Sequence, residues 1–430
     1  MFIETPEQMH ELLKLMRMHT SIINLYYTHP TRHPSLNDVL GVFIYVNKHT
    51  YVISIRHPDA IHISDKILDV IYASPGRKII FDRKRIKYFV KEIKNGIDAK
   101  VCSYLNFKES IDTEFNITQK NDLRSVPIMI LLKHFKNMCL VLKNFSFSSG
   151  SILFESDFSN ALYEIEKNGL FVRNFNLGSD ELVNSDNLVY SQYNMLTPTG
   201  RPSNAFGNVN FAALNKKTGQ RDCFVSRFLD DGLLVMVDYE SYHLRLLANF
   251  LEYDLPKSSL HEYLGRLYHG KDKLTEEEYE ISKKITFNLI YGGITDDVKM
   301  NVPFMKKIAD YVDSVWDFYC TNHYVETWYY KRRISDVFFK KNVNSYKIFN
   351  YLLQSAETEK NCKIISELNN HFRNMRSKII LYTYDAFLFD VHKTEFEVMK
   401  SLIDVITSDG QYPIRMYSGK SYGSMKQINF

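Results

Sequence analysis

The first third of the chain alternates between short apolar runs and polar turns. Apolar side chains recur near helical spacing over residues 1–19, which predicts a short helix. Three apolar runs of strand length follow between residues 21 and 63, and KIIFD at 78–82 is a fourth. Strands followed by helical segments predict an α/β domain over residues 1–145. The serine-rich stretch 145–151 is interpreted as a linker.

Helical periodicity dominates the rest of the chain, interrupted by apolar runs that contain aspartates. A predicted helix ends at Gly169, a typical stop residue. GLLVMVDY at 232–239 predicts a buried strand, and KIILYTYDAFLFDVH at 378–392 predicts a pair of strands around Tyr384 and Asp385. Long helices are predicted at 261–269, 276–293, 302–330 and 347–375.

Composition narrows the class of protein. A chain of 430 residues is too long for one ordinary core and predicts two or three domains. Hydrophobic residues at 45% and charged residues at 24% are typical of globular proteins, and no apolar segment is long enough to span a membrane. Five scattered cysteines without a CxxC pair indicate reduced thiols and a cytoplasmic location.

Positive charge gives weak support for a nucleic-acid partner. The net charge is +4, and eight lysines and arginines fall within residues 77–94, where 83–95 predicts an exposed helix. A second cluster contains Lys331, Arg332 and Arg333. Such runs are as typical of a solvated helix face as of a DNA-contacting surface.

Two aspartates stand at the ends of strongly apolar runs. Asp238 follows LLVMV, and Asp385 follows IILYTY. A carboxylate there is costly unless it is hydrogen-bonded, paired or bound to metal. For either residue alone, a turn at a strand end is the simpler interpretation. On adjacent strands, however, the two could hold two Mg²⁺ ions, with Mn²⁺ as a substitute, and support phosphoryl transfer.

Five segments, in chain order, resemble family A (Pol I-like) DNA polymerases. Each is moderately specific, and the resemblance covers about residues 155–425. The segments are TPTGRPSNAFGNVN at 197–210, DYESYHLRLLA at 238–248 (motif A), KKITFNLIYGG at 283–293 (the O-helix of motif B), NYLLQSAE at 350–357 and YTYDAFLFDV at 382–391 (motif C). Their common order and credible spacing favour polymerase ancestry.

The resemblance implies a role for each matched residue. Asp238 and Asp385 would hold the metal ions, and Lys283 would contact the triphosphate and act as general acid. Further residues implied to bind the nucleotide are Tyr239, His243, His261, Phe287 and Tyr291. Residues implied to contact DNA are Arg201, Asn208, Asn210, Arg245, Gly292, Asn350, Gln354 and Tyr384. Spacing by four puts Lys283, Phe287 and Tyr291 on one helix face, although an aromatic stripe is also typical of a core.

The chain departs from the family at several positions. His243 replaces the motif A glutamate that excludes ribonucleotides, which leaves sugar selectivity open, and Tyr279 replaces an arginine that contacts the triphosphate. Motif C reads YDA at 384–386 in place of His-Asp-Glu. Only about 25 residues separate a helix-like segment at 161–172 from Thr197, where the family has a long helical thumb, so a reduced thumb is expected.

The family also carries a ribonuclease H-like 3′–5′ exonuclease at its amino-terminal side. Such an enzyme needs an Asp-x-Glu on its first strand, whereas IINLYYTHP at 22–30 contains no acid. We therefore expect a degenerate exonuclease domain without hydrolytic activity, retained for DNA contact through the basic cluster at 77–94.

These features predict a multidomain protein of the α/β and α+β classes with a right-hand polymerase fold. The expected parts are a degenerate exonuclease domain at 1–145, a reduced thumb and linker at 146–196, and palm and fingers at 197–430, with the fingers at about 255–335. The expected function is template-directed DNA synthesis that adds dNTPs to a primer 3′-hydroxyl by two-metal phosphoryl transfer, without proofreading.

Expected partners are primer–template DNA, dNTPs and a processivity or thumb-replacing protein, with no membrane. Compact size favours a viral or phage enzyme acting in the host cytoplasm. Two alternatives stay open. The first is a ribonucleotide-tolerant or single-subunit RNA polymerase, which the substitution at His243 supports. The second is a catalytically inactive scaffold that binds primer–template, which the changes at Tyr279, Tyr384 and Ala386 support.

Overall fold

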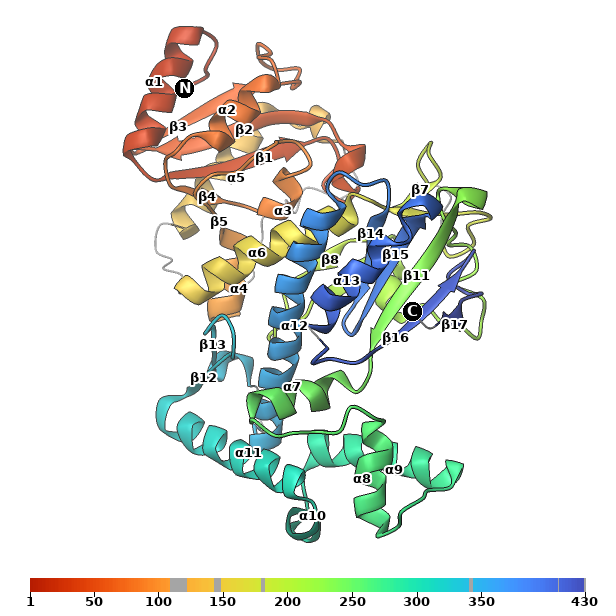
Figure 1. Ribbon diagram of the computed structural model, residues 1–430. Coiled ribbons are helices and arrows are strands. Elements are labelled where there is room, and N and C mark those ends of the chain that lie inside the picture. The colour runs from red at the N-terminus through yellow and green to blue at the C-terminus, as the bar shows by residue number, and fades with distance from the viewer. Residues whose placement is uncertain (109–121, 143–147, 179–181, 340–342, 409, 429–430) are drawn as a thin grey trace. The chain divides into compact units, whose positions relative to one another are not determined.

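The computed structural model describes residues 1–108, 122–142, 148–178, 182–339, 343–408 and 410–428 (Figure 1). The chain divides into two compact units, Met1–Lys167 and Asn168–Phe430. This boundary lies beyond the predicted one at residue 145, because the serine-rich stretch starts helix α6 (Ser149–Glu166), with the Ser148 hydroxyl as its N-cap, and does not form a linker. The first part of the predicted linker, 145–147, lies outside the described residues.

A five-stranded mixed sheet organises the first unit, in the order β3-β2-β1-β4-β5. Its strands are β1 (Ser21–Tyr27), β2 (Val39–Val46), β3 (His49–Ser54), β4 (Lys78–Ile80) and β5 (Gly96–Asp98). The first three are antiparallel, and β4 and β5 run parallel to β1.

Alternate β1 side chains enter two separate cores, as strand geometry requires. Ile23 and Leu25 join the core that contains α1 (Pro6–Met18) and α2 (Lys66–Ala73). Ile22 and Tyr26 join the core that contains α5 (Ile128–Leu142). The sheet is therefore covered on both faces, which explains why its strands read as continuous apolar runs. Helix α4 (Ala99–Phe107) follows β5 directly.

The exposed helix predicted at 83–95 is wrong. Only Arg83–Ile86 are helical (α3), and several basic side chains of the cluster are used internally. Lys78 is buried and donates to the carbonyls of Gly76 (2.9 Å) and Lys94 (2.8 Å). The Arg83 guanidinium donates to the Ser156 hydroxyl (2.7 Å). Because these charges are satisfied inside the unit, residues 77–94 do not form a continuous basic surface.

The second unit contains a five-stranded antiparallel sheet in the order β14-β15-β11-β16-β17. Its strands are β11 (Gly232–Tyr239), β14 (Lys378–Thr383), β15 (Ala386–His392), β16 (Ile414–Gly419) and β17 (Lys426–Ile428). The three strands predicted from the apolar runs are β11, β14 and β15, and the structure places them side by side.

Helices and short hairpins surround this sheet. The helices are α7 (Tyr242–Phe250), α8 (Leu260–His269), α9 (Glu276–Gly292), α10 (Asp296–Asn301), α11 (Pro303–Asn322), α12 (Ser345–Phe372) and α13 (Val398–Thr407). The short strands are β6 (Leu170–Phe171), β7 (Leu188–Val189), β8 (Tyr193–Asn194), β9 (Ser203–Phe206), β10 (Val209–Asn210), β12 (Tyr324–Glu326) and β13 (Arg333–Ser335). In the part of the chain that the structure describes, no helix has the length and apolarity to cross a membrane.

The long helix predicted at 302–330 ends earlier than its periodicity suggests. Helix α11 stops at Asn322, because His323 adopts a left-handed conformation with φ of 61°. The chain then forms the β12–β13 hairpin. The aromatic residues that continue the apolar pattern beyond Asn322 thus belong to the hairpin and to the loop between its strands.

Helix α12 contains a segment that is buried on all sides. Residues 355–359 are buried in succession, which is more than one full turn, so no side of the helix faces solvent at this level. Helices α7, α9 and α11 and strand β14 pack against it, and Figure 1 shows it beside the sheet. These five residues include two glutamates, Glu357 and Glu359, whose carboxylates need partners because they are removed from water.

Glu359 forms a buried ion pair with Arg332. The Arg332 Nε donates to Glu359 at 3.1 Å, and both side chains are inaccessible to solvent. A second nitrogen of Arg332 donates to the Thr199 carbonyl at 2.8 Å, which also accepts a hydrogen bond from the Ser355 hydroxyl at 3.2 Å. Arg332, part of a predicted surface cluster, therefore anchors the segment that leads to Arg201.

We predict that Glu359→Ala destabilises the protein by about 3 kcal/mol or more, because it leaves the Arg332 charge buried without a counter-charge. Urea-induced unfolding measures the loss. The matched control is Glu326→Ala, which removes the acid of the exposed Arg333–Glu326 pair (side chains 59% and 39% exposed) and should cost less than about 1 kcal/mol. Equal losses in the two variants would contradict the anchoring role.

Candidate active site

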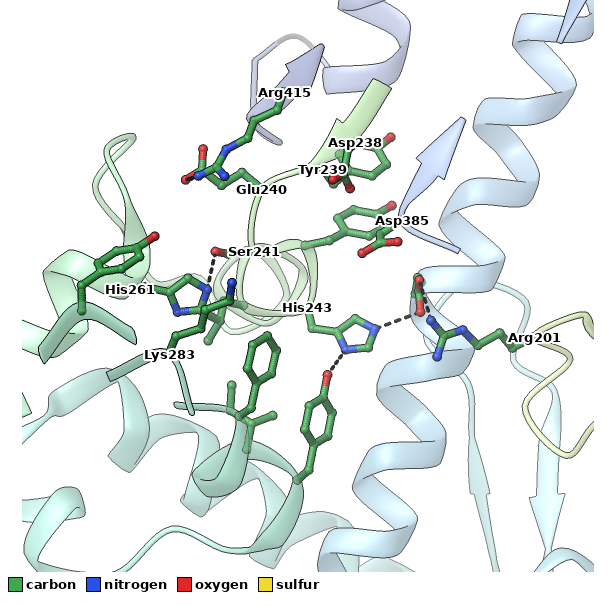
Figure 2. A pocket seen from close by; sticks show the side chains of 17 residues that line it. Arg201, Asp238, Tyr239, Glu240, Ser241, His243, His261, Lys283, Asp385 and Arg415 are labelled. Carbon is green, nitrogen blue, oxygen red and sulfur yellow. Dashed lines mark hydrogen bonds and ion pairs between the residues drawn. The ribbon is translucent and has the colours of Figure 1, made fainter. Parts of the chain in front are cut away.

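Asp238 and Asp385 meet at one end of the antiparallel sheet. Strands β11 and β15 pair with Asp238 opposite Ala386, and the Tyr239 N–H donates to the Asp385 carbonyl at 3.0 Å. The turn between β14 and β15 is formed by Tyr384, whose φ is +64°. This tight turn places Asp385 directly beside the end of β11, and Figure 2 shows both carboxylates on the same side of the pocket.

The two carboxylates carry negative charge that the described residues only partly neutralise. Burial, followed by repulsion from Asp385, raises the pKa of Asp238 to about 6. Burial, followed by repulsion from Glu357, raises the pKa of Asp385. Adjacent, partly buried carboxylates with raised pKa values fit a divalent cation, whose charge would favour their ionised forms. Their oxygen donors suit Mg²⁺, which takes further ligands from water and substrate phosphates.

Most residues implied to bind the nucleotide line one pocket with these carboxylates (Figure 2). The predicted residues that the structure brings together there are Arg201, Asp238, Tyr239, His243, His261, Lys283, Phe287, Tyr291 and Asp385. They come from segments up to 184 positions apart along the sequence, namely Arg201 and Asp385. The pocket is therefore a product of the tertiary fold.

Helix α9 presents Lys283, Phe287 and Tyr291 to the pocket. Thr275 starts the helix with a capping box, in which its side chain and that of Glu278 satisfy each other's backbone N–H groups. The Phe287 and Tyr291 rings are parallel, with centroids 6.0 Å apart. Phe287 is 40% exposed. The aromatic stripe is thus an accessible surface of the pocket, which argues against the core-packing interpretation.

His243 lies at the centre of a continuous chain of polar contacts. Its Nδ1 is 2.5 Å from the Tyr291 hydroxyl, and its Nε2 is 2.9 Å from the Glu357 carboxylate. Glu357 also accepts a hydrogen bond from Arg201 at 3.4 Å. The Arg201 guanidinium in turn stacks on the Tyr384 ring, 3.8 Å from its centroid. These contacts link residues from all five segments that resemble family A DNA polymerases.

A second group at the pocket carries positive charge. Lys283 and His261 lie on the same side of the pocket, and the Ser241 hydroxyl is 3.3 Å from the His261 Nε2. Burial, followed by the nearby Lys283 charge, lowers the pKa of His261, so that its imidazole is neutral at physiological pH. Arg415 on β16 also lines the pocket and donates to Glu240 at 2.9 Å.

Several residues implied to contact DNA lie outside this pocket. They are Asn208, Asn210, Arg245, Gly292, Asn350, Gln354 and Tyr384. Arg245 is buried and donates to the carbonyls of Pro256 (2.7 Å) and Ser258 (3.1 Å), a position that favours a structural role over DNA contact. The side-chain N–H₂ of Asn350 donates to the Tyr291 carbonyl at 3.0 Å.

Sequence reasoning missed three charged residues of the pocket, Glu240, Glu357 and Arg415. Glu357 closes the quoted segment NYLLQSAE, but a glutamate on a helical pattern is usually solvated, so its burial was not foreseen. Arg415 belongs to none of the five segments. Its position is visible only in the strand register, where it pairs with Asp238.

The fold defines the class of protein: the chain has the fold of a DNA polymerase domain. It matches the POL domain of Pol1 from M. smegmatis, solved in complex with DNA primer-template and dNTP, with a TM-score of 0.70 over 98% of this chain and 99% of that chain, at 16% identity. The coarse fold prediction, a mixed α/β polymerase domain, is thereby confirmed.

In sequence, the chain is 29% identical to a DNA polymerase of Bacillus phage SP01 over 166 residues. The match covers 34% of this chain and 18% of the phage protein. No family model matches the chain.

We predict that Asp238→Asn stabilises the metal-free protein at neutral pH. The folded-state pKa is raised from 3.8 to about 6, so ionisation of Asp238 lowers stability as the pH rises from about 4 to about 6, and this cost persists at higher pH. In the presence of a chelator at about pH 7.5, the unfolding temperature of the variant should lie a few degrees above that of the wild-type chain. This is the order expected for a partly exposed group. The gain should vanish below about pH 4.

The control for this prediction is Asp390→Asn. Asp390 is buried on β15, and its carboxylate accepts hydrogen bonds from the Ser226 hydroxyl (2.6 Å) and Arg227 Nε (2.8 Å). Removing a satisfied, ion-paired carboxylate should lower the unfolding temperature. If both variants shifted in the same direction, the negative charge at Asp238 would not be the source of the instability.

Proposed function

We propose that the chain is a template-directed DNA polymerase of the family A type, which adds dNTPs to a primer 3′-hydroxyl. One observation carries this proposal: a single pocket joins the sheet-end carboxylates of Asp238 and Asp385 to the α9 face of Lys283, Phe287 and Tyr291. The phage relative and the structural neighbour, each by its name, support the same activity. The phage relative also supports the expectation of a viral enzyme acting in a host cytoplasm.

The proposed chemistry divides between the two sides of the pocket. Asp238 and Asp385 would hold two Mg²⁺ ions, which supply activation of the primer hydroxyl and neutralisation of phosphate charge when bound. Lys283 would bind the triphosphate and protonate the departing pyrophosphate. Neutral His261 would donate a hydrogen bond to a phosphate oxygen from the same side. The primer oxygen displaces pyrophosphate from the α-phosphate, so one phosphodiester forms as one anhydride bond breaks.

The remaining residues would position the nucleotide and the duplex. Phe287 and Tyr291 offer parallel rings for the sugar and the nascent base pair. Arg201 would contact the primer terminus, and the amides of Asn208, Asn210, Asn350 and Gln354 would face minor-groove acceptors that every correct base pair shares. One N–H of the Asn350 amide already donates to the Tyr291 carbonyl, so its second N–H would make this contact.

We predict that a labelled primer–template is extended in the presence of Mg²⁺ and dNTPs, and that the Asp238→Ala, Asp385→Ala double variant loses extension by at least about 10³-fold. Gel analysis of the products measures this. Folding of the variant is verified by thermal unfolding. Duplex binding without extension by the wild-type chain would instead support the inactive-scaffold interpretation.

Arg415 is proposed to replace the triphosphate-binding arginine that is absent at Tyr279. Arg415 lies on β16, lines the pocket with Tyr279 and Lys283, and is held by Glu240. A guanidinium offers several donors in a planar fork that matches phosphate oxygens. The palm sheet would thus supply a positive charge that the α9 helix lacks.

We predict that Arg415→Gln raises the KM for dNTP about tenfold, as expected for the loss of one charge-assisted contact, with a smaller effect on kcat. Steady-state primer extension measures both constants. Arg333→Gln is the matched control, since Arg333 also pairs with a glutamate (Glu326) but lies on the exposed β12–β13 hairpin. An unchanged KM in the Arg415 variant would show that this arginine only braces Glu240.

We also propose that the amino-terminal unit is a degenerate ribonuclease H-like exonuclease domain. Its support is the mixed sheet of order β3-β2-β1-β4-β5 and a first strand that bears Asn24 and no acid. Two buried acids of the unit contact neighbouring groups. Asp98 caps α4 through the Val101 N–H (3.0 Å), and Glu155 lies 3.7 Å from the Arg83 guanidinium. Incubation without dNTPs should therefore leave the primer at full length.

A reduced thumb belongs to the same proposal. Between α6 and Thr197 the described residues contain the short strands β6, β7 and β8 and no α-helix. A thumb holds duplex through phosphate contacts, which provide most non-specific affinity. We propose that a separate protein supplies this grip when long products are made.

A further inference from the structure

Glu357 is a buried acid whose only role so far is to connect other residues. It lies on α12 with a side chain 1% exposed, and it is paired with Arg201 and His243. It also lies close enough to Asp385 to raise the pKa of that residue. Burying a carboxylate is costly, so its contacts to the pocket residues need an explanation beyond packing.

Hydrogen bonds hold His243 at both ring nitrogens. A carboxylate oxygen accepts hydrogen bonds, so His243 Nε2–H donates to Glu357 at 2.9 Å. The Nδ1 is 2.5 Å from the Tyr291 hydroxyl. Burial raises the pKa of Tyr291 to about 12, so this hydroxyl keeps its proton. Both ring nitrogens therefore have partners in the orientation that the structure shows.

The two contacts hold the imidazole from opposite sides. Tyr291 belongs to α9, while Glu357 belongs to the buried part of α12. Without Glu357, the ring could rotate about its χ torsions or adopt the other tautomer while still contacting Tyr291. Figure 2 shows His243 in the middle of the pocket, with a contact at each of its two ring nitrogens.

We propose that Glu357 is a positioning residue that sets deoxyribose over ribose selection by fixing the His243 ring. This inference rests on the proposed polymerase function. A ring held by two partners blocks the space beside C2′ of the incoming sugar, so a 2′-hydroxyl would clash or leave a buried polar group unpaired. A ring free on one side can turn away and admit the hydroxyl. Selectivity therefore depends on a residue that acts through His243.

The decisive comparison is between two conservative variants of Glu357. Glu357→Gln keeps an oxygen acceptor at the same reach but removes the charge, whereas Glu357→Asp keeps the charge but withdraws the oxygen by one methylene. The measured quantity is the ratio of kcat/KM for dCTP to that for CTP in primer extension. We expect the Asp variant to lower this ratio about tenfold, the effect of losing one hydrogen bond to a charged group, and the Gln variant to retain it within about twofold.

A double-mutant cycle tests whether the effect passes through His243. His243→Ala should itself reduce the ratio, and adding Glu357→Asp to that background should change it no further. The matched control is Glu367→Asp, an exposed glutamate on the same helix, which should leave the ratio unaltered. Thermal unfolding verifies that each variant is folded.

The outcomes separate failure of this inference from failure of the proposed function. If the wild-type chain does not extend a primer with dNTPs, the polymerase proposal falls. If it does, and Glu357→Asp keeps the wild-type ratio while Glu357→Gln loses it, Glu357 acts as a charge and the positioning inference is overturned. The inference is also overturned if Glu357→Asp lowers the ratio equally with and without His243.

Discussion

The second unit depends on the requirement that a carboxylate removed from water must have partners. Helix α12 carries Glu357 and Glu359 within one turn, both buried. Glu359 binds Arg332, which fixes the Thr199 carbonyl, and Glu357 binds Arg201 and His243. Both acids lie on one helix. Their ion pairs and hydrogen bonds therefore connect α12 to the segment at Thr199, to the β12–β13 hairpin and to α7 around the pocket.

The same principle distinguishes the carboxylates at the sheet. Asp390 is satisfied by Ser226 and Arg227 and contributes to folding. Asp238 and Asp385 line the same pocket and have raised pKa values, so their ionisation costs stability. Carboxylates with raised pKa values, placed across a pocket from Lys283, are typical of a site that binds a cation and an anionic substrate. A buried aspartate therefore stabilises the fold where it has partners, and it is suited to binding a cation where it has none that neutralise it.

Several departures from the family pattern are coordinated in space. His243, at the position where the family has a glutamate, has partners in both Tyr291 and Glu357. Arg415, on the sheet beside α9, lines the same pocket as Tyr279, where the family has an arginine. Tyr384, which replaces a motif C histidine, provides the ring on which Arg201 stacks. In the sequence, each change removes a residue of the family pattern. In the folded chain, the residue that replaces it makes a different contact.

The sequence by itself determined what depends on local periodicity. The apolar runs predicted β11, β14 and β15, and spacing by four predicted the α9 face, because strand and helix repeats act over a few residues. Only the tertiary structure decided which charges are buried and with whom. Glu357 and His243 are 114 positions apart and Arg415 and Glu240 are 175, and Lys78 and Arg332 resemble surface residues until their internal acceptors are known. Pairing across such separations depends on strand register and helix packing, which no local pattern encodes.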